Sequence, residues 1–219
     1  MIPTFKIERS LQIPPAGIAA DLRMPDDARG LIIFAHGSGS SRLSSRNRFV
    51  AGVLHHAGFA TLLLDLLTAQ EEEIDIRTRR LRFDIDLLAK RLSEATKWSQ
   101  EDRDTSGLTI GYFGASTGAA AALIATSEVP GGIRAVVCRG GRPDLAGPAL
   151  LRVAAPTLLI VGGNDIPVIE LNEQAFQELR CEKKLEIVPG ATHLFEEPGT
   201  LERVAELASR WFDEHIPVV

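Results

Sequence analysis

A serine flanked by glycines is the residue in this chain best suited to nucleophilic chemistry. The segment Gly114-Ala115-Ser116-Thr117-Gly118 lies between the apolar run Leu108 to Phe113 and the alanine-rich run Ala119 to Ala125. That setting predicts a strand, a sharp turn and a helix, which together hold the serine hydroxyl clear of its surroundings. Glycines on both sides of the serine let the neighbouring backbones pass closely. The pattern is typical of a serine that attacks a carbonyl carbon.

Two further residues could complete a catalytic triad with Ser116. Asp165 follows the apolar run Thr157 to Val161, and His193 follows the run Lys184 to Val188. Near neutral pH an imidazole can accept the serine proton and later donate it to the leaving group. The aspartate would hold the ring in the required tautomer and stabilise the imidazolium. The order of serine, aspartate and histidine along the chain is the order that α/β-hydrolases use.

Attack by the serine places a negative charge on the carbonyl oxygen, and backbone N–H groups are expected to stabilise it. One expected donor is the N–H of Thr117, at the start of the helix that follows the serine. The other is expected from the loop His36 to Ser41, where Ser38 is the predicted donor and Gly37 its close competitor. Loss of one such donor typically removes about 3 kcal/mol of transition-state stabilisation.

Several polar residues near predicted strand ends also have structural interpretations. Asp165 could cap the helix that follows it, a use that is compatible with catalysis. Asp65 also follows a predicted strand and is the alternative acid. His36 precedes the oxyanion loop, where an orienting role is favoured over proton transfer. His55 and His56 are expected to form a partly exposed pair within a helix.

Apolar runs predict the strands that must position these residues. Thr4 to Ile13 and Ile18 to Met24 predict an antiparallel hairpin at the start of the chain. The later runs do not alternate polar with apolar residues, which is typical of strands buried on both faces of a parallel sheet. These runs are Leu31 to Ala35, Ala60 to Leu64, Leu108 to Phe113, Ala135 to Cys138, Thr157 to Val161 and Lys184 to Val188.

Helical patterns fill the intervals between the apolar runs. They cover Arg46 to Ala57, Arg79 to Trp98, Val168 to Arg180 and Thr200 to His215. The acidic stretch Gln70 to Asp75 is instead expected to be a solvated loop. Alternating strands and helices predict a doubly wound α/β fold, and we expect one domain over residues 1–219.

Size, composition and charge narrow the classes of protein. A chain of 219 residues, of which 45% are hydrophobic, suits one folded single-core domain and excludes a disordered chain. The formal net charge of −5 disfavours nucleic-acid and anionic-membrane partners. Cys138 and Cys181 have neither metal-ligand spacing nor a disulfide framework. We expect no metal and no cofactor.

The amino-terminal segment lacks the basic stretch and apolar core of a signal peptide. No uncharged apolar stretch approaches the ~20 residues that span a bilayer. The expectation is a soluble cytoplasmic protein, monomeric or homodimeric, that acts on a small molecule and has neither a nucleic-acid nor a membrane partner.

With these motifs in order, the chain resembles a single-domain α/β-hydrolase of the dienelactone hydrolase family. The resemblance runs from about residue 18 to residue 215 and rests on His36-Gly37-Ser38-Gly39, Gly114 to Gly118, Leu158 to Asp165 and Gly190 to Phe195. It implies eight strands, the second antiparallel, with helices on both faces of the sheet. The short segment Cys138 to Val153 argues against a large lid.

The nucleophile departs from the family pattern. Dienelactone hydrolases proper carry a cysteine at the elbow, and this chain carries Ser116. The resemblance therefore implies a carboxylic-ester hydrolase mechanism, without making dienelactone the expected substrate.

Three arginines are expected near the mouth of the site. Arg139 and Arg142 follow one predicted strand, and Arg42 follows the oxyanion loop. A guanidinium binds carboxylate or phosphate through a planar fork, so small anionic esters or lactones are candidate substrates. Surface salt bridges are the alternative interpretation of the same arginines.

Other functions remain open at this point. A thioesterase, an acyltransferase or a peptidase would use the same triad, and a hydrolase fold can also serve non-catalytic binding. A nucleotide-binding protein is disfavoured, because Gly37 to Arg42 lacks the third glycine of G-x-G-x-x-G and no phosphate-binding G-x-x-x-x-G-K-[ST] motif occurs.

Overall fold

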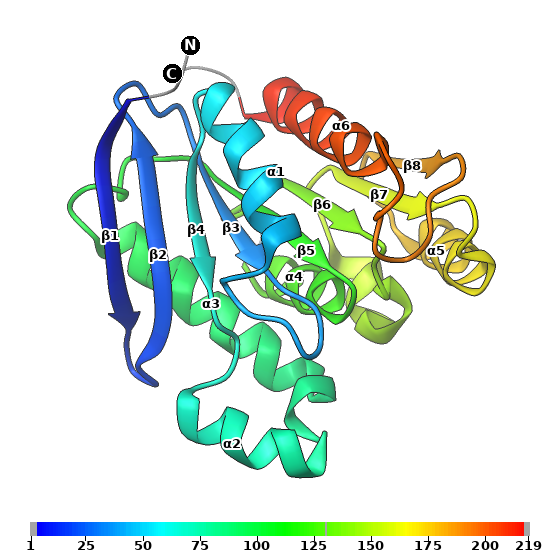
Figure 1. Cartoon of the computed structure of the whole chain (residues 1–219), viewed down its shortest axis with the longest axis horizontal. Helices are drawn as coiled ribbons and strands as arrows, with labels where there is room; N and C mark the ends of the chain where they lie inside the picture. The colour runs from blue at the N-terminus through cyan, green and yellow to red at the C-terminus, as the bar shows by residue number, and fades with distance from the viewer. Residues whose placement is uncertain (1–3, 130, 217–219) are drawn as a thin grey trace.

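The apolar runs form the strands of one mixed sheet. The computed structural model describes residues 4–129 and 131–216. Within these residues, eight strands lie in the order β1-β2-β4-β3-β5-β6-β7-β8 (Figure 1). Their bounds are β1 Phe5–Ile13, β2 Ile18–Pro25, β3 Leu31–Ala35, β4 Ala60–Leu64, β5 Ile110–Ala115, β6 Ala135–Arg139, β7 Thr157–Gly162 and β8 Lys183–Val188.

Strand β2 alone runs against its neighbours. It pairs antiparallel with β1 on one side and with β4 on the other, whereas the pairs from β4 through β8 are all parallel. The parallel strands are buried on both faces, except β8 at the edge of the sheet. The predicted α/β-hydrolase arrangement, with its antiparallel second strand, is confirmed.

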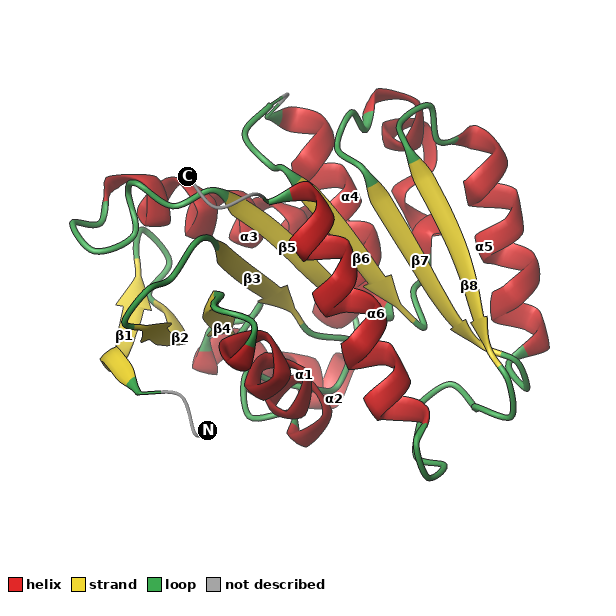
Figure 2. Ribbon diagram, turned by 90° about the horizontal axis from the view of Figure 1, so that it is seen from above, coloured by secondary structure: helices red, strands yellow, loops and turns green. Residues whose placement is uncertain are grey.

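Helices cover both faces of the sheet (Figure 2). Helices α1 and α6 pack together on one face, while α3 and α4 pack together on the other, where α5 also lies. The segment between β6 and β7 holds only the short helix η2, so the expectation of no large lid is confirmed for the described residues. The bounds are α1 Ser45–His56, α2 Ala69–Thr78, η1 Leu81–Phe83, α3 Ile85–Glu101, α4 Thr117–Glu128, η2 Pro143–Arg152, α5 Ile166–Glu178 and α6 Thr200–His215.

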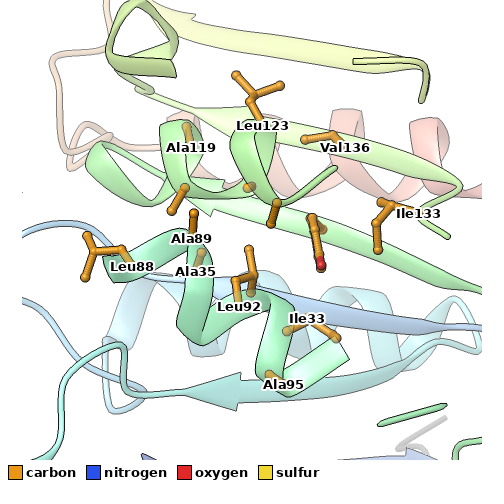
Figure 3. Packing of buried hydrophobic residues seen from close by; sticks show 14 of the residues in the cluster. Ile33, Ala35, Leu88, Ala89, Leu92, Ala95, Ala119, Leu123, Ile133 and Val136 are labelled. Atoms are coloured by element: carbon orange, nitrogen blue, oxygen red, sulfur yellow. The ribbon is translucent and has the colours of Figure 1, made fainter. Parts of the chain in front are cut away.

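The sheet separates two apolar clusters. The larger one packs Leu88 and Leu92 of α3 and Leu123 of α4 against Ile33 of β3 and Val136 of β6 (Figure 3). Alanines fill the first two turns of α4 and are completely buried. Small side chains let this helix lie close to β3 and β5, which fixes the position of the residue that precedes it. Burying apolar surface of this kind contributes roughly 25 cal/mol per Å².

The acidic segment Gln70 to Asp75 differs from its prediction as a solvated loop. It belongs to α2, which begins with a capping box in which Thr68 and Glu71 exchange side-chain and backbone hydrogen bonds. Asp75 is fully buried and accepts hydrogen bonds from the N–H of Leu81 and from Nε of Arg82. The carboxylate therefore ties α2 to η1, a role that a count of charges does not reveal.

The long helix predicted from Arg79 to Trp98 is also shorter than expected. Arg79 adopts a left-handed conformation with φ of 55° and ends α2. Helix α3 starts only at Ile85, where the side chain of Asp84 accepts a hydrogen bond from the N–H of Leu87. The chain turns between the two helices because each has its own cap.

The prediction of a partly exposed histidine pair is wrong for His55. Its side chain is buried, and Nε2 lies 2.7 Å from Oγ1 of Thr61 on β4. Burial lowers the pKa of His55 to about 4, and the positive charge of Arg23 acts in the same direction. His56 is exposed, as expected. None of the helices in the described ranges combines the length and apolar character that crossing a membrane requires.

Candidate active site

Ser116 occupies a strained turn between β5 and α4. Its backbone has φ of 51° and ψ of −121°, a conformation that costs a non-glycine residue about 1–3 kcal/mol. The Ser116 N–H donates to the carbonyl of Arg139 at 3.2 Å, and its own carbonyl accepts from the N–H of Arg142 at 3.1 Å. The loop after β6 thus holds the turn in place from the side.

Two glycines allow the close approaches that this turn needs. A Cβ on Gly118 would collide with the carbonyl oxygen of Ala35, because the first turn of α4 lies directly on the end of β3. A Cβ on Gly37 would lie 2.9 Å from Cβ of Ser116. The loop after β3 and the serine therefore sit against each other, as an oxyanion site built from both requires.

Asp165 and His193, the predicted acid and base, are joined by a hydrogen bond. Nδ1 of His193 lies 2.7 Å from Oδ2 of Asp165, and the two side chains are 39% and 14% exposed. Asp165 holds the N-cap position of α5, yet its side chain makes no capping hydrogen bond. The carboxylate is directed to the imidazole, which leaves Nε2 of His193 free to accept a proton.

Ser116 and His193 approach the same short segment of backbone. A Cβ on Gly140 would lie 3.7 Å from Cε1 of His193, and Gly140 follows the residue whose carbonyl binds the Ser116 N–H. No hydrogen bond joins the serine hydroxyl to the imidazole within the described part of the chain. Such bonds often form only when substrate closes the site.

The loop that carries His193 is held by a residue that the sequence did not single out. Glu197 accepts hydrogen bonds from the N–H and the hydroxyl of Thr192, at 3.0 and 2.6 Å. These bonds, the side-chain one first, hold the pKa of Glu197 below its ordinary value. Asn164 donates from Nδ2 to the carbonyl of Gly190 and ties the acid loop to the histidine loop. No sequence motif marks these hydrogen bonds, because Asn164 and Gly190 are far apart in the chain and meet only when it is folded.

The expected oxyanion donors belong to two segments next to Ser116. Ser38 follows Gly37 in the loop after β3, and Thr117 begins α4. Neither N–H group has a hydrogen-bond acceptor within residues 4–129 and 131–216. The Thr117 hydroxyl is likewise buried without a partner in that part of the chain. The N–H groups of Ser38 and Thr117 therefore have no acceptor in the described residues that a ligand oxygen would have to displace.

His36 holds the oxyanion loop rather than facing the serine. Its Nδ1 donates to the carbonyl of Gly37 at 2.9 Å, and its Nε2 accepts from the N–H of Leu66 at 3.0 Å. Burial lowers the pKa of His36, so the ring stays neutral and keeps both bonds. This arrangement is the orienting one that the sequence favoured.

Two of the three arginines predicted near the site are paired with carboxylates. Arg42 donates to Asp65 from its backbone N–H and from Nη1, at 2.8 and 2.5 Å. It borders a cavity of about 520 Å³ that Asp65 also lines and that no triad residue lines. Arg142 forms a two-pronged bond with Asp144, which raises the pKa of Arg142. Asp65, the alternative acid, is therefore joined to an arginine and not to a histidine.

Arg139 is set apart from the other two. Its side chain is only 6% exposed, and its one hydrogen bond to the described residues is a long contact of 3.4 Å between Nη2 and Oδ1 of Asn47. Burial, followed by the charge of Arg46, lowers the pKa of Arg139 to about 10. The structure thus places a buried cation next to the serine turn, where the sequence suggested only a cluster of arginines.

Comparisons with known proteins agree with this architecture. A family model described as "Dienelactone hydrolase family" matches residues 18–215. A solved dienelactone hydrolase from Anabaena variabilis is 56% identical, has a TM-score of 0.94, and is matched over 99% of this chain and 100% of its own. The esterase Est1E from Butyrivibrio proteoclasticus shares the fold at 16% identity, with a TM-score of 0.78 over 95% of this chain and 98% of its own.

Curated relatives from Mycobacterium tuberculosis are longer than this chain. They are 58% identical over 202 residues, which is 92% of this chain and 45% of theirs. Each is provisionally named a phosphoribosyl transferase. The chain therefore spans less than half the length of the curated proteins that it matches.

Proposed function

The chain belongs to the dienelactone hydrolase family, and from that premise we propose that it is a serine-dependent carboxylic-ester hydrolase. Its substrates are esters or lactones of small molecules, including anionic ones. The observation that carries the proposal is the 2.7 Å bond between His193 and Asp165, on the loops after β8 and β7, at the edge of the sheet where β5 leads into the strained turn of Ser116. A serine, a base and an acid in this order and setting support acyl transfer through a covalent intermediate.

The reaction begins with attack of the Ser116 oxygen on the substrate carbonyl carbon. His193 accepts the hydroxyl proton at Nε2, while Asp165 stays ionised and stabilises the imidazolium. The N–H groups of Ser38 and Thr117 bind the oxygen on which the negative charge develops. Collapse of this intermediate breaks the bond to the alcohol, which leaves with the proton from His193.

Water then completes the cycle. His193 removes a proton from water, whose oxygen attacks the acyl carbon bound to Ser116. The second tetrahedral intermediate collapses, the serine oxygen regains the proton from His193, and the carboxylic acid departs. The same acyl-enzyme could pass its acyl group to another acceptor, so thioesterase and acyltransferase activities use identical residues.

Hydrolysis of 4-nitrophenyl butyrate tests the proposal. Wild-type protein is expected to release 4-nitrophenolate, and Ser116→Ala is expected to reduce kcat by several orders of magnitude. A folded wild-type protein that hydrolyses neither this ester nor lactones and thioesters would instead support the non-catalytic alternative.

The transferase name of the Mycobacterium tuberculosis relatives concerns proteins of which this chain spans 45%. We propose that phosphoribosyl transfer belongs to the part of those proteins that this chain does not match. A Ser-His-Asp arrangement is suited to acyl transfer, and the match to the dienelactone hydrolase family covers residues 18–215 of this chain.

A further inference from the structure

Arg139 is a buried cation whose charge no carboxylate of the described residues neutralises. Among residues 4–129 and 131–216, its Nε is buried without a hydrogen-bond partner, and Nη2 has only the long contact with the amide oxygen of Asn47. Burying a charge is costly unless it is paired and hydrogen-bonded. The Arg139 guanidinium therefore has a positive charge and N–H donors that could still bind an anion.

A second arginine increases the positive charge at this place. Arg46 lies in the first turn of α1, beside Asn47, and that turn contains no acidic residue. Its Nε is also buried without a partner in the described part of the chain, and its Nη1 lies 3.5 Å from Oε1 of Glu196. Since Glu196 is 65% exposed, this contact is weak and easily replaced. The N-terminal end of a helix adds further positive potential.

This pair of arginines adjoins the proposed reaction centre. The carbonyl of Arg139 accepts the N–H of Ser116, and the Arg139 guanidinium lies 5.9 Å from the ring of Phe195, two residues after His193. The charges of Arg42 and Arg142 differ in being neutralised by close carboxylates, those of Asp65 and Asp144. An anion held by Arg139 and Arg46 would thus be part of a molecule bound at the serine.

We propose that Arg139 and Arg46 bind a doubly charged oxyanion, a phosphate or phosphonate group carried by the ester substrate. The proposal rests on the esterase function and specifies the substrate class of the same site. Two guanidinium groups with one weak carboxylate contact leave more than one positive charge uncompensated, and a carboxylate would balance only one. A phosphate group carries about −1.5 to −2 charges near neutral pH and offers three acceptor oxygens. It would take the place of Glu196 on Arg46.

A matched series of esters tests the charge preference. The 4-nitrophenyl esters of butyric, succinic and 3-phosphonopropionic acid present a methyl, a carboxylate and a phosphonate at the same position of the acyl chain. At mildly alkaline pH, wild-type kcat/KM is expected to be about 10- to 100-fold higher for the phosphonate ester than for the butyrate, as charge-assisted hydrogen bonds allow. Equal values for all three esters, or a preference for succinate over phosphonate, would overturn the proposal.

Substitutions show which residues cause the preference for the phosphonate ester over the butyrate ester. Arg46→Gln and Arg139→Met should reduce the phosphonate-to-butyrate ratio, whereas Glu196→Gln should raise it about 2- to 5-fold by freeing Arg46. Arg180→Gln, an exposed arginine after α5, is the matched control and should leave the ratio unchanged. Should Arg139→Met fail to fold, an unchanged ratio in both Arg46→Gln and Glu196→Gln would still overturn the proposal.

Binding of inorganic phosphate tests the anion site independently of ester hydrolysis. Inorganic phosphate is expected to bind Ser116→Ala in a calorimetric titration, and several-fold more weakly when Arg46→Gln is added. If wild-type protein hydrolyses none of the esters but this binding pattern is seen, the esterase proposal fails and the anion site stands. Absence of phosphate binding, or binding that ignores Arg46, refutes the anion site even if the esters are hydrolysed.

Discussion

At the scale of single residues, the site depends on where hydrogen-bond capacity is used and where it is left free. The Asp165 carboxylate makes no capping hydrogen bond with α5, the helix that follows it, and instead binds the imidazole of His193. The N–H groups of Ser38 and Thr117 have no acceptor within the described part of the chain. The proposed mechanism rests on these two features, because it needs a base that is held in place and N–H donors that no other acceptor occupies.

Replacing Asp165, the proposed acid, should reduce kcat while the protein stays folded. Asp165→Asn keeps the size of the side chain but favours the wrong tautomer of His193, so kcat should fall by about three to four orders of magnitude. Asp65→Asn is the matched control, because Asp65 bonds to Arg42 and not to a histidine. Steady-state kinetics with 4-nitrophenyl butyrate checks both. A larger loss of kcat in Asp65→Asn would reverse the assignment of the acid.

At the scale of elements, the serine turn depends on how closely α4 lies on β3. The first turn of this helix leaves no room for a side chain at Gly118, whose Cβ would strike the carbonyl oxygen of Ala35. The helix can therefore not retreat without moving Ser116.

Adding one methyl group at this contact should be destabilising. Gly118→Ala is expected to lower the free energy of unfolding by about 3 kcal/mol and to reduce activity, because α4 must shift. Gly52→Ala provides the control, since a Cβ there meets no atom within 4 Å and Gly52 lies inside α1. That change should raise stability by roughly 0.5–1 kcal/mol. Urea unfolding measures both, and equal effects of the two substitutions would contradict the close packing.

The contact between α1 and β4 should make stability depend on pH. The pKa of His55 is about 4 in the folded protein and 6.5 as its ordinary value, so the unfolded chain binds this proton more readily. The folded state is therefore not destabilised by this group above about pH 6.5, and it loses about 2 kcal/mol of stability by about pH 5 as the unfolded chain takes up the proton. His55→Gln keeps a polar partner for Thr61 and cannot titrate. Its stability, measured by urea unfolding from about pH 7.5 down to about pH 5, should therefore fall less than that of the wild type. Parallel losses in the two proteins would refute this origin.

The sequence predicts those parts of the molecule that local pattern determines. The turn around Ser116 and the uninterrupted apolar strands each lie within a short segment, and the sheet that the apolar runs predict is the one found. Contacts between segments that are far apart in the sequence cannot be predicted from local patterns. Sequence patterns predict Asp75 in a solvated loop and His55 in a partly exposed pair, yet both are buried, bonded to Arg82 and Thr61 respectively. Likewise, spacing alone could not separate Arg139 from Arg142, because only Arg142 meets a carboxylate.

At the scale of the whole molecule, one sheet carries every residue of the proposed mechanism. The serine follows β5, the acid β7 and the histidine β8, while the oxyanion loop follows β3. These strands are parallel, so their carboxyl ends meet at one edge of the sheet. The apolar clusters on the two faces share those strands, and we expect the chain to behave as one cooperative unit.

Thermal unfolding tests this expectation. Residues 1–219 should unfold in one transition, with the calorimetric enthalpy equal to the van't Hoff enthalpy. Two resolved transitions would divide the chain into independent units and contradict the expected single domain.

The proposed mechanism requires Ser116 to be an activated nucleophile. Its most direct test is reaction of the native protein with a fluorophosphonate, followed by mass spectrometry of the labelled peptide. We expect one label on Ser116, abolished by Ser116→Ala and by prior heat denaturation, and formed much more slowly in His193→Ala. A folded protein that remains unlabelled, or that carries the label on another residue, would contradict it.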